Sequence, residues 1–314
     1  ERLNFESDEI SWGTKNELIF VIFTSIIAGF IAKLPHYFGF TEEFYYQRNL
    51  AFVVFPLLVA YFVWKHNTPI KRIVMASIAI LVSVLYINFL PNNNQSDTLI
   101  LACLHLPLFL WAVLGFTYLS DQVKNNQRRL EYLRYNGDLV VMTAIILLAG
   151  GLFSALTINL FRLIDIHIEE FYFKNIVVGG RAASPIVGTY LVQTNPQLVN
   201  KVSPVIAKIF TPFVLVTLVV YLVAVIYTGK DPYNDREFLL IFNMLLIGVM
   251  AITFFSIAES SKTSGSKITT LMLFALSIVT IVVNGIALSA IVFRISEWGI
   301  TPNRLAVLGS NILI

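Results

Sequence analysis

Residues 139–160 read LVVMTAIILLAGGLFSALTINL, and residues 161–181 read FRLIDIHIEEFYFKNIVVGGR. The first stretch is almost wholly apolar and reaches the roughly 20 residues that a helix needs to cross a bilayer. In the second stretch, charged residues alternate with large apolar ones directly beside that run. Together they predict a membrane protein and mark the place where its regular pattern changes.

The composition of the whole chain supports a membrane environment. Its 314 residues are 57% apolar and 13% charged, against about 25% charged residues in soluble domains. The single cysteine, Cys103, lies in an apolar run and excludes disulfide frameworks and cysteine-based metal sites. The formal net charge of +3 is read as a topology signal, so membrane lipids are the expected partners and nucleic acid is not.

Apolar runs of membrane-spanning length recur along the chain and are separated by short polar turns. Because backbone groups must pair internally within lipid, such runs form helices. We therefore predict an all-α polytopic transmembrane bundle with eight full spans and the start of a ninth at Leu305–Ile314. The full spans are expected at Glu17–Leu34, Arg48–Trp64, Lys71–Leu90, Thr98–Leu119, Leu139–Leu160, Pro204–Tyr227, Phe238–Ala258 and Ile268–Phe293.

Lysine and arginine residues predict the orientation. With a cytoplasmic N-terminus, thirteen of the 22 basic residues fall on the cytoplasmic side, as the positive-inside rule requires. The most basic loop, Ser120–Gly137, then either anchors the topology or forms a short interfacial helix over anionic lipid; we favour the anchor. This loop divides the chain into a four-span region, 1–137, and a second membrane region, 138–314.

The second region contains a long segment, 162–203, that we expect not to span the membrane. Its apolar part, Ile176–Leu191, is interrupted by Gly-Gly-Arg and Ser-Pro. These interruptions predict a helix lying on the surface or a re-entrant piece packed on protein.

Asp165, His167 and Glu169 alternate with isoleucines in this segment. On an extended strand they would share one face, and carboxylate and imidazole groups bind divalent cations. The three residues are therefore candidate metal ligands. We favour the alternative, an amphipathic connector with a solvated polar edge, because metal sites usually need more convergent ligands than one short stretch supplies.

Several polar side chains lie within the predicted spans. Ser277, Thr280 and Asn284 follow i, i+3, i+7 spacing and so share one helix face. Such a stripe more often bonds helices together, at roughly 0.6–2 kcal/mol per contact, than it lines a pathway. If a cavity is present, we expect its lining to be Asn159, Asn243, Ser277, Thr280 and Asn284.

Residues 294–304 read RISEWGITPNR. Trp298 suits the membrane interface, Gly299 permits a sharp turn, and Thr301 followed by Pro302 is typical of a helix N-terminus. Arg294 and Arg304 flank the turn, at the cytoplasmic edge in the predicted topology. We expect Arg304 to reach lipid phosphate or the carbonyl end of a neighbouring helix.

This segment resembles a signature of bacterial multi-pass membrane proteins of the domain-of-unknown-function family 4153. Those proteins carry an Arg-Ile, an aromatic-Gly pair and then Thr-x-x-Arg, with Tyr more often than Trp at the aromatic position. The resemblance extends from about Gly137 to the end and implies an integral protein of the bacterial inner membrane, with no established activity or cofactor. The matching residues are Arg294, Ile295, Trp298, Gly299, Thr301 and Arg304.

Three functions remain open at the level of sequence. The favoured one is a transport-like or small-molecule and lipid-binding protein, with a cavity in the second region. The second is a membrane scaffold or sensor that relays to a soluble part or protein partner; the chain begins without methionine and stops in an apolar run, so we expect the native protein to be longer. An intramembrane enzyme is least favoured, because no nucleophile elbow, HExxH motif or phosphate-binding glycine loop is present.

Overall fold

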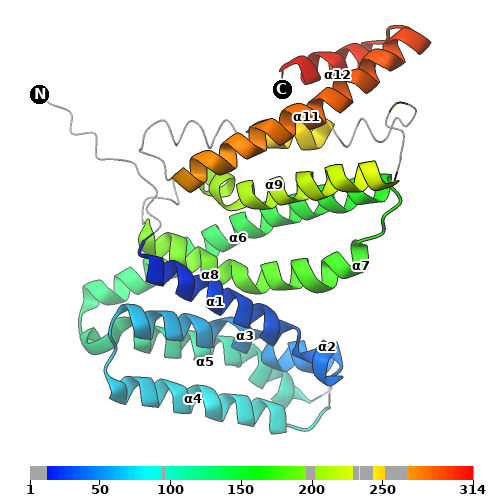
Figure 1. Ribbon diagram of the computed structural model, residues 1–314. Coiled ribbons are helices and arrows are strands. Elements are labelled where there is room, and N and C mark those ends of the chain that lie inside the picture. Colours follow the sequence, from blue (N-terminus) through cyan, green and yellow to red (C-terminus); the bar gives the residue numbers. More distant parts are fainter. Residues whose placement is uncertain are drawn as a thin grey trace, which may run out of the picture. The chain divides into compact units, whose positions relative to one another are not determined.

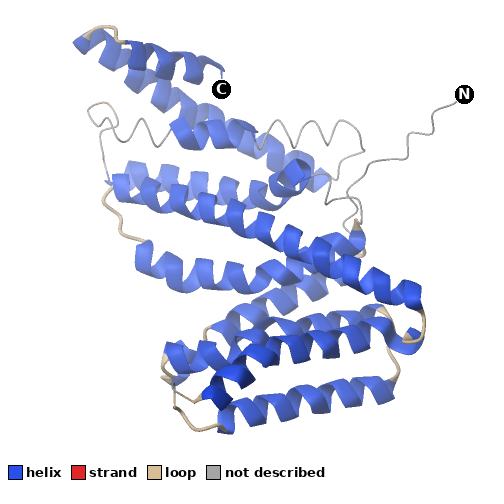
Figure 2. Cartoon of the chain, turned by 180° about the vertical axis from the view of Figure 1, so that it is seen from behind, coloured by secondary structure: helices blue, strands red, loops and turns tan. Residues whose placement is uncertain are grey.

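The protein is helical in every regular element that the structure describes (Figure 2). The structure is a computed structural model and describes residues 13–93, 96–195, 202–228, 233, 243–251 and 267–313. Its labelled helices are α1 (Lys15–Ala32), α2 (Leu34–Phe38), α3 (Glu42–Lys65), α4 (Ile70–Phe89), α5 (Asp97–Leu119), η1 (Ser120–Gln122), α6 (Asn126–Leu163), α7 (Glu169–Tyr172), η2 (Phe173–Val177), α8 (Val178–Thr194), α9 (Val202–Thr228), α11 (Lys267–Trp298) and α12 (Pro302–Leu313) (Figure 1).

Seven of these helices are long and apolar enough to cross a membrane: α1, α3, α4, α5, α6, α9 and α11. Each overlaps one of the predicted spans, so the all-α class is confirmed and seven of the eight predicted full spans correspond to candidate membrane-spanning helices. The predicted span Phe238–Ala258 lies mostly outside the described residues, of which 243–251 are helical. The helix α12 begins at Pro302, three residues before the predicted start of the ninth span, and it is not among the seven candidate spans.

The chain divides into two compact units. The first consists of Ser11–Leu147 and Phe173–Val199, and the second of Leu148–Tyr172 and Asn200–Ile314, together with the first ten residues, which lie outside the described part. The long helix α6 contributes to both units. This division differs from the one predicted at residue 137, because the segment after α6 returns to the first unit.

Residues 169–194 of the connecting segment form one continuous helix, without the interruptions that the sequence suggested. The helices α7, η2 and α8 follow one another without a break, over 4, 5 and 17 residues, a length of about 39 Å. Within the first unit, α8 runs antiparallel to α1, since Thr194 lies beside Gly13 and Gly179 lies beside Gly29. The helix is therefore long enough to cross a hydrocarbon core of about 30 Å.

The glycines and the proline that suggested interruptions are compatible with a continuous helix. A Cβ on Gly29 would lie 3.5 Å from the Gly179 Cα, so these glycines let two helix backbones approach closely. The Ser184 hydroxyl donates to the Gly180 carbonyl at 2.6 Å, which keeps a polar group satisfied beside Pro185. Glycine and proline thus serve helix packing here and do not end the helix.

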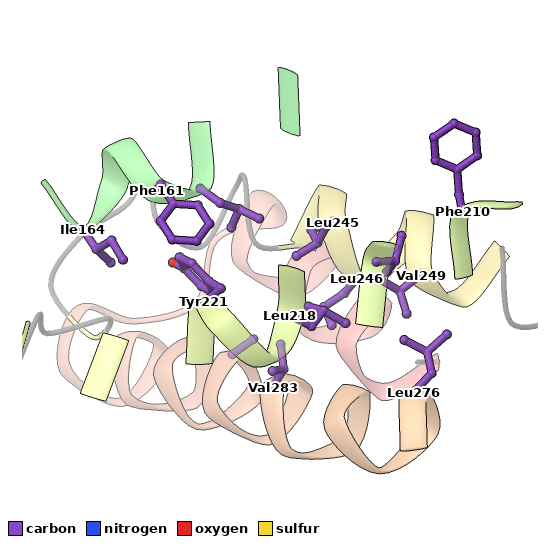
Figure 3. Close-up of a cluster of buried hydrophobic side chains, with 13 residues drawn as sticks. Phe161, Ile164, Phe210, Leu218, Tyr221, Leu245, Leu246, Val249, Leu276 and Val283 are labelled. Carbon is purple, nitrogen blue, oxygen red and sulfur yellow. The ribbon is translucent and has the colours of Figure 1, made fainter. Parts of the chain in front are cut away.

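In the second unit, α6, α9 and α11 share an apolar core with residues 243–251 (Figure 3). The rings of Phe153 and Phe210 lie 5.9 Å apart, and those of Phe161 and Tyr221 lie 5.8 Å apart. Because both partners advance along the chain together, α6 and α9 run parallel in this unit. The colours of Figure 1 show α11 running in the same direction as α9.

Candidate functional site

A groove lies between α4 and α5 in the first unit. Its volume is about 690 Å³, within the range of about 300–1,000 Å³ that is typical of small-molecule sites. We call it the α4–α5 groove. Mostly apolar residues from the second half of α4 and the first half of α5 line it: Ala79, Val82, Ser83, Tyr86, Ile87, Thr98, Leu101, Ala102, His105, Leu106 and Phe109.

Small side chains and a proline explain why two adjacent helices leave this space. Ala79, Ser83 and Ala102 fill little volume between the helix axes. Pro107 lies inside α5, where it cannot donate to the Cys103 carbonyl and its ring crowds that oxygen, which favours a bend in the helix. The opening is therefore built into the sequence of both helices.

The groove matches the depth of one membrane leaflet. From Thr98 to Phe109 it follows α5 for eleven residues, or about 16 Å. That is about half of the roughly 30 Å hydrocarbon core. Leu101, Val82 and Tyr86 are more than half exposed, so the groove opens outward.

His105 is the most polar group that lines the groove. It is exposed, contrary to the usual expectation for a histidine within an apolar run. Its Nδ1 lies 2.8 Å from the Leu101 carbonyl oxygen, and a carbonyl can only accept, so Nδ1 carries the hydrogen. In the neutral ring, Nε2 is then a hydrogen-bond acceptor, and it has no partner among the described residues.

A buried arginine supports the inner wall of the groove. Ile87 and Leu106 pack in one core with Phe52 and Leu110. Arg48 is only 1% exposed, and its guanidinium caps the end of α4. It donates to the carbonyls of Ile87 at 2.7 Å, Leu90 at 2.9 Å and Pro91 at 3.2 Å, and to the Asn92 side chain at 3.5 Å. The carbonyls at this helix end favour a cation.

A second buried polar cluster joins α1 to α3. The Glu17 carboxylate accepts from the Tyr61 hydroxyl at 2.6 Å and from Lys65 Nζ at 2.9 Å. Beside it, His66 Nδ1 lies 2.9 Å from the Tyr118 carbonyl; burial lowers the pKa of His66, while this carbonyl bond opposes the shift. Every charge in the cluster has a partner, so it holds helix ends together.

The candidate metal ligands do not converge. Glu169 pairs with Arg162 at 2.9 Å, and His167 Nδ1 lies 3.8 Å from Glu169 Oε2 with its side chain 74% exposed. Asp165 has a left-handed backbone with φ of 57°, so the three residues do not form the extended strand that would align them. In the described part of the chain, no group of three His, Cys, Asp or Glu residues is placed to hold a metal ion.

The polar stripe of α11 bonds mainly within helices. Ser277 donates to the Leu273 carbonyl and Thr280 to the Leu276 carbonyl; on α6, Asn159 likewise donates to the Ala155 carbonyl at 2.8 Å. Asn284 alone bonds another helix, donating to the Asn311 carbonyl at 2.8 Å.

Asn243 and Asn311 add buried amides to the second unit. Asn243 is 6% exposed and Asn311 is 1% exposed, and neither side-chain amide has a hydrogen-bond partner among the described residues. Of the predicted cavity residues, the structure thus connects Asn284 to α12 and does not join the others into one site.

The family-like segment forms the corner between α11 and α12. Thr301 Oγ1 accepts from the Arg304 amide at 3.3 Å, and Gly299 has a φ of 76°, as the predicted cap and turn require. Arg304 donates to the Trp298 and Gly299 carbonyls at 2.7 and 2.6 Å. Arg304 thus contacts carbonyls at the C-terminal end of α11. Arg294 lies over the Trp298 ring, 5.4 Å from its centroid.

Sequence reasoning missed both the groove and the buried role of Arg48. Arg48 and Glu17 stand at the starts of predicted spans, where a charged side chain normally reaches water. A second polar residue next to Arg48, Asn49, could have indicated that this helix face is buried. The side-chain amides of Asn49 and Asn88 form two hydrogen bonds with each other, at 2.9 and 2.8 Å. Spacing within one run cannot reveal the groove, because its two walls come from separate helices.

Comparison of the chain with protein-family models, with curated proteins and with solved structures found no match. The resemblance to the family of unknown function therefore stays a prediction.

Proposed function

We propose that this protein is an integral protein of the bacterial inner membrane with a cytoplasmic N-terminus. It binds one hydrocarbon chain of a lipid or lipid-like small molecule in the α4–α5 groove. The observation that carries the proposal is the groove itself, an outward-facing and mostly apolar space of about 690 Å³. Its length of about 16 Å suits a chain lying within one leaflet.

This proposal moves the binding site from the second region, where a cavity was expected, to the first. It keeps the class of function that the sequence favours. The scaffold or sensor alternative predicts a different occupant, since a helix from a protein partner would then fill the groove. The two functions differ in what binds, so one pair of variants tests both.

Replacing Ala102 with tryptophan is expected to fill the groove and exclude the chain. Ala102 lines the groove, whereas Ala112 lies on the same helix, is exposed and does not line it. Ala112→Trp is therefore a matched control. With a photoreactive stearate probe in phosphatidylglycerol and phosphatidylethanolamine vesicles, we expect Ala102→Trp to lower crosslinking to α4 and α5 about tenfold, a change of about 1.4 kcal/mol, and Ala112→Trp to leave it unchanged.

Equal crosslinking in the two variants would contradict the proposed site. A change in oligomeric state or partner association in Ala102→Trp, without a change in crosslinking, would instead support the scaffold reading. Thermal unfolding of both variants in detergent shows whether either substitution merely disrupts the helix pair.

A further inference from the structure

We propose that the α4–α5 groove selects a chain that carries a hydrogen-bond donor, such as a hydroxyl, at the depth of His105. This inference rests on the proposed function and adds the chemical class of the ligand. Inside a membrane, an apolar groove alone attracts a lipid chain only weakly. Lipid tails are as apolar as leucine side chains, so apolar burial alone gives a chain little reason to leave the bilayer.

Selectivity must then come from a polar contact, and His105 supplies one. Its ring lines the groove, and the bond from Nδ1 to the Leu101 carbonyl fixes which nitrogen carries the hydrogen. The remaining nitrogen, Nε2, accepts hydrogen bonds in the neutral ring. Water is scarce at this depth, so an unpaired acceptor is costly and a donor on the ligand would remove that cost.

The other polar groups of the groove do not compete for this role. The Ser83 hydroxyl already donates to the Ala79 carbonyl of its own helix at 2.5 Å. Thr98 and Tyr86 lie near the ends of α5 and α4 that adjoin the turn, close to where a lipid head would lie. His105 stands seven residues further along α5 than Thr98, or about 10 Å deeper.

The groove thus has polar side chains at its outer end, an acceptor about 10 Å below, and apolar walls between and beyond them. A plain acyl chain satisfies the walls but not Nε2. A chain with a hydroxyl near its middle satisfies both, with the hydroxyl donating to Nε2. Ligands with an amide N–H at that depth belong to the same class.

The test compares stearate with a stearate that carries one hydroxyl near the middle of the chain. Each fatty acid competes with the photoreactive stearate probe for binding to the whole protein in vesicles. In the unmodified protein we expect the hydroxylated chain to compete about fivefold better, the size that one interhelical-type hydrogen bond in lipid gives. His105→Phe should abolish the preference, so that the two fatty acids compete equally, whereas His105→Gln, which keeps an acceptor, should retain part of it.

The outcomes separate this inference from the proposed function. Equal competition by the two chains, with crosslinking still lost in Ala102→Trp, overturns the selectivity but leaves the lipid site in place. Crosslinking that is insensitive to Ala102→Trp overturns both. A preference that persists in His105→Phe shows that another group reads the hydroxyl and also overturns the assignment to His105.

Discussion

A cysteine that replaces Asn303 is expected to react from the opposite side of the membrane to a cysteine that replaces Lys124. Both positions are exposed. Asn303 lies in the corner that follows α11, and Lys124 lies just before α6. The charge pattern of the sequence instead predicts both positions on the cytoplasmic side. The side from which each cysteine is labelled therefore distinguishes the two topologies.

The expectation follows from helix directions. The helices α6 and α9 run parallel in the second unit, as the ring pairs Phe153–Phe210 and Phe161–Tyr221 show, and α11 runs the same way (Figure 1). The corner after α11 therefore lies toward the end of α6, while Lys124 lies at its beginning. Parallel α6 and α9 require a return crossing between them, and we infer that the continuous helix Glu169–Thr194 makes it.

The measurement uses a membrane-impermeant maleimide on sealed vesicles of known orientation. Replacing Cys103, the only cysteine, with alanine gives the background. Asn93→Cys is the matched reporter, since Asn93 and Lys124 flank opposite ends of α5. We expect labelling of Asn303→Cys to follow Asn93→Cys; labelling with Lys124→Cys would mean that the segment Glu169–Thr194 does not cross.

The sequence predicted the helices more reliably than their directions. The length of the apolar runs was enough to locate the seven candidate spans, because a helix that crosses a bilayer needs about 20 mostly apolar residues. The continuity of the helix through Gly179 and Pro185 was not predicted, because these residues break isolated helices, whereas here Gly179 approaches Gly29 on α1. That contact depends on residues 150 positions apart in the chain, which no local pattern reports.

The candidate site shows the same limit. The corner residues Thr301, Gly299 and Arg304 act locally, within six residues of one another, and their roles were predictable from residue type. The α4–α5 groove depends on how two helices pack, and the cap by Arg48 depends on a helix end 39 residues away. Neither follows from spacing within a single run.

Arg48→Met is expected to destabilise the first unit more than any single surface substitution. The guanidinium bonds three carbonyls at the end of α4, which lack partners within their own helix. Methionine fills similar space but donates nothing, so these acceptors lose their donors in a site where Arg48 is 1% exposed. We expect a loss of about 2–4 kcal/mol, seen as a fall of roughly 5–15 °C in apparent Tm.

Arg128→Met is the matched control, because Arg128 is 39% exposed and pairs with Glu131 at 3.3 Å. Such an exposed pair contributes about 1 kcal/mol or less, so its loss should barely change Tm in detergent. Arg48→Lys should fall between the two, since lysine keeps the charge but cannot span all the carbonyls. Equal melting of Arg48→Met and Arg128→Met would show that the cap is not what holds α4 to α3, and that the inner wall of the groove is stabilised by its apolar contacts alone.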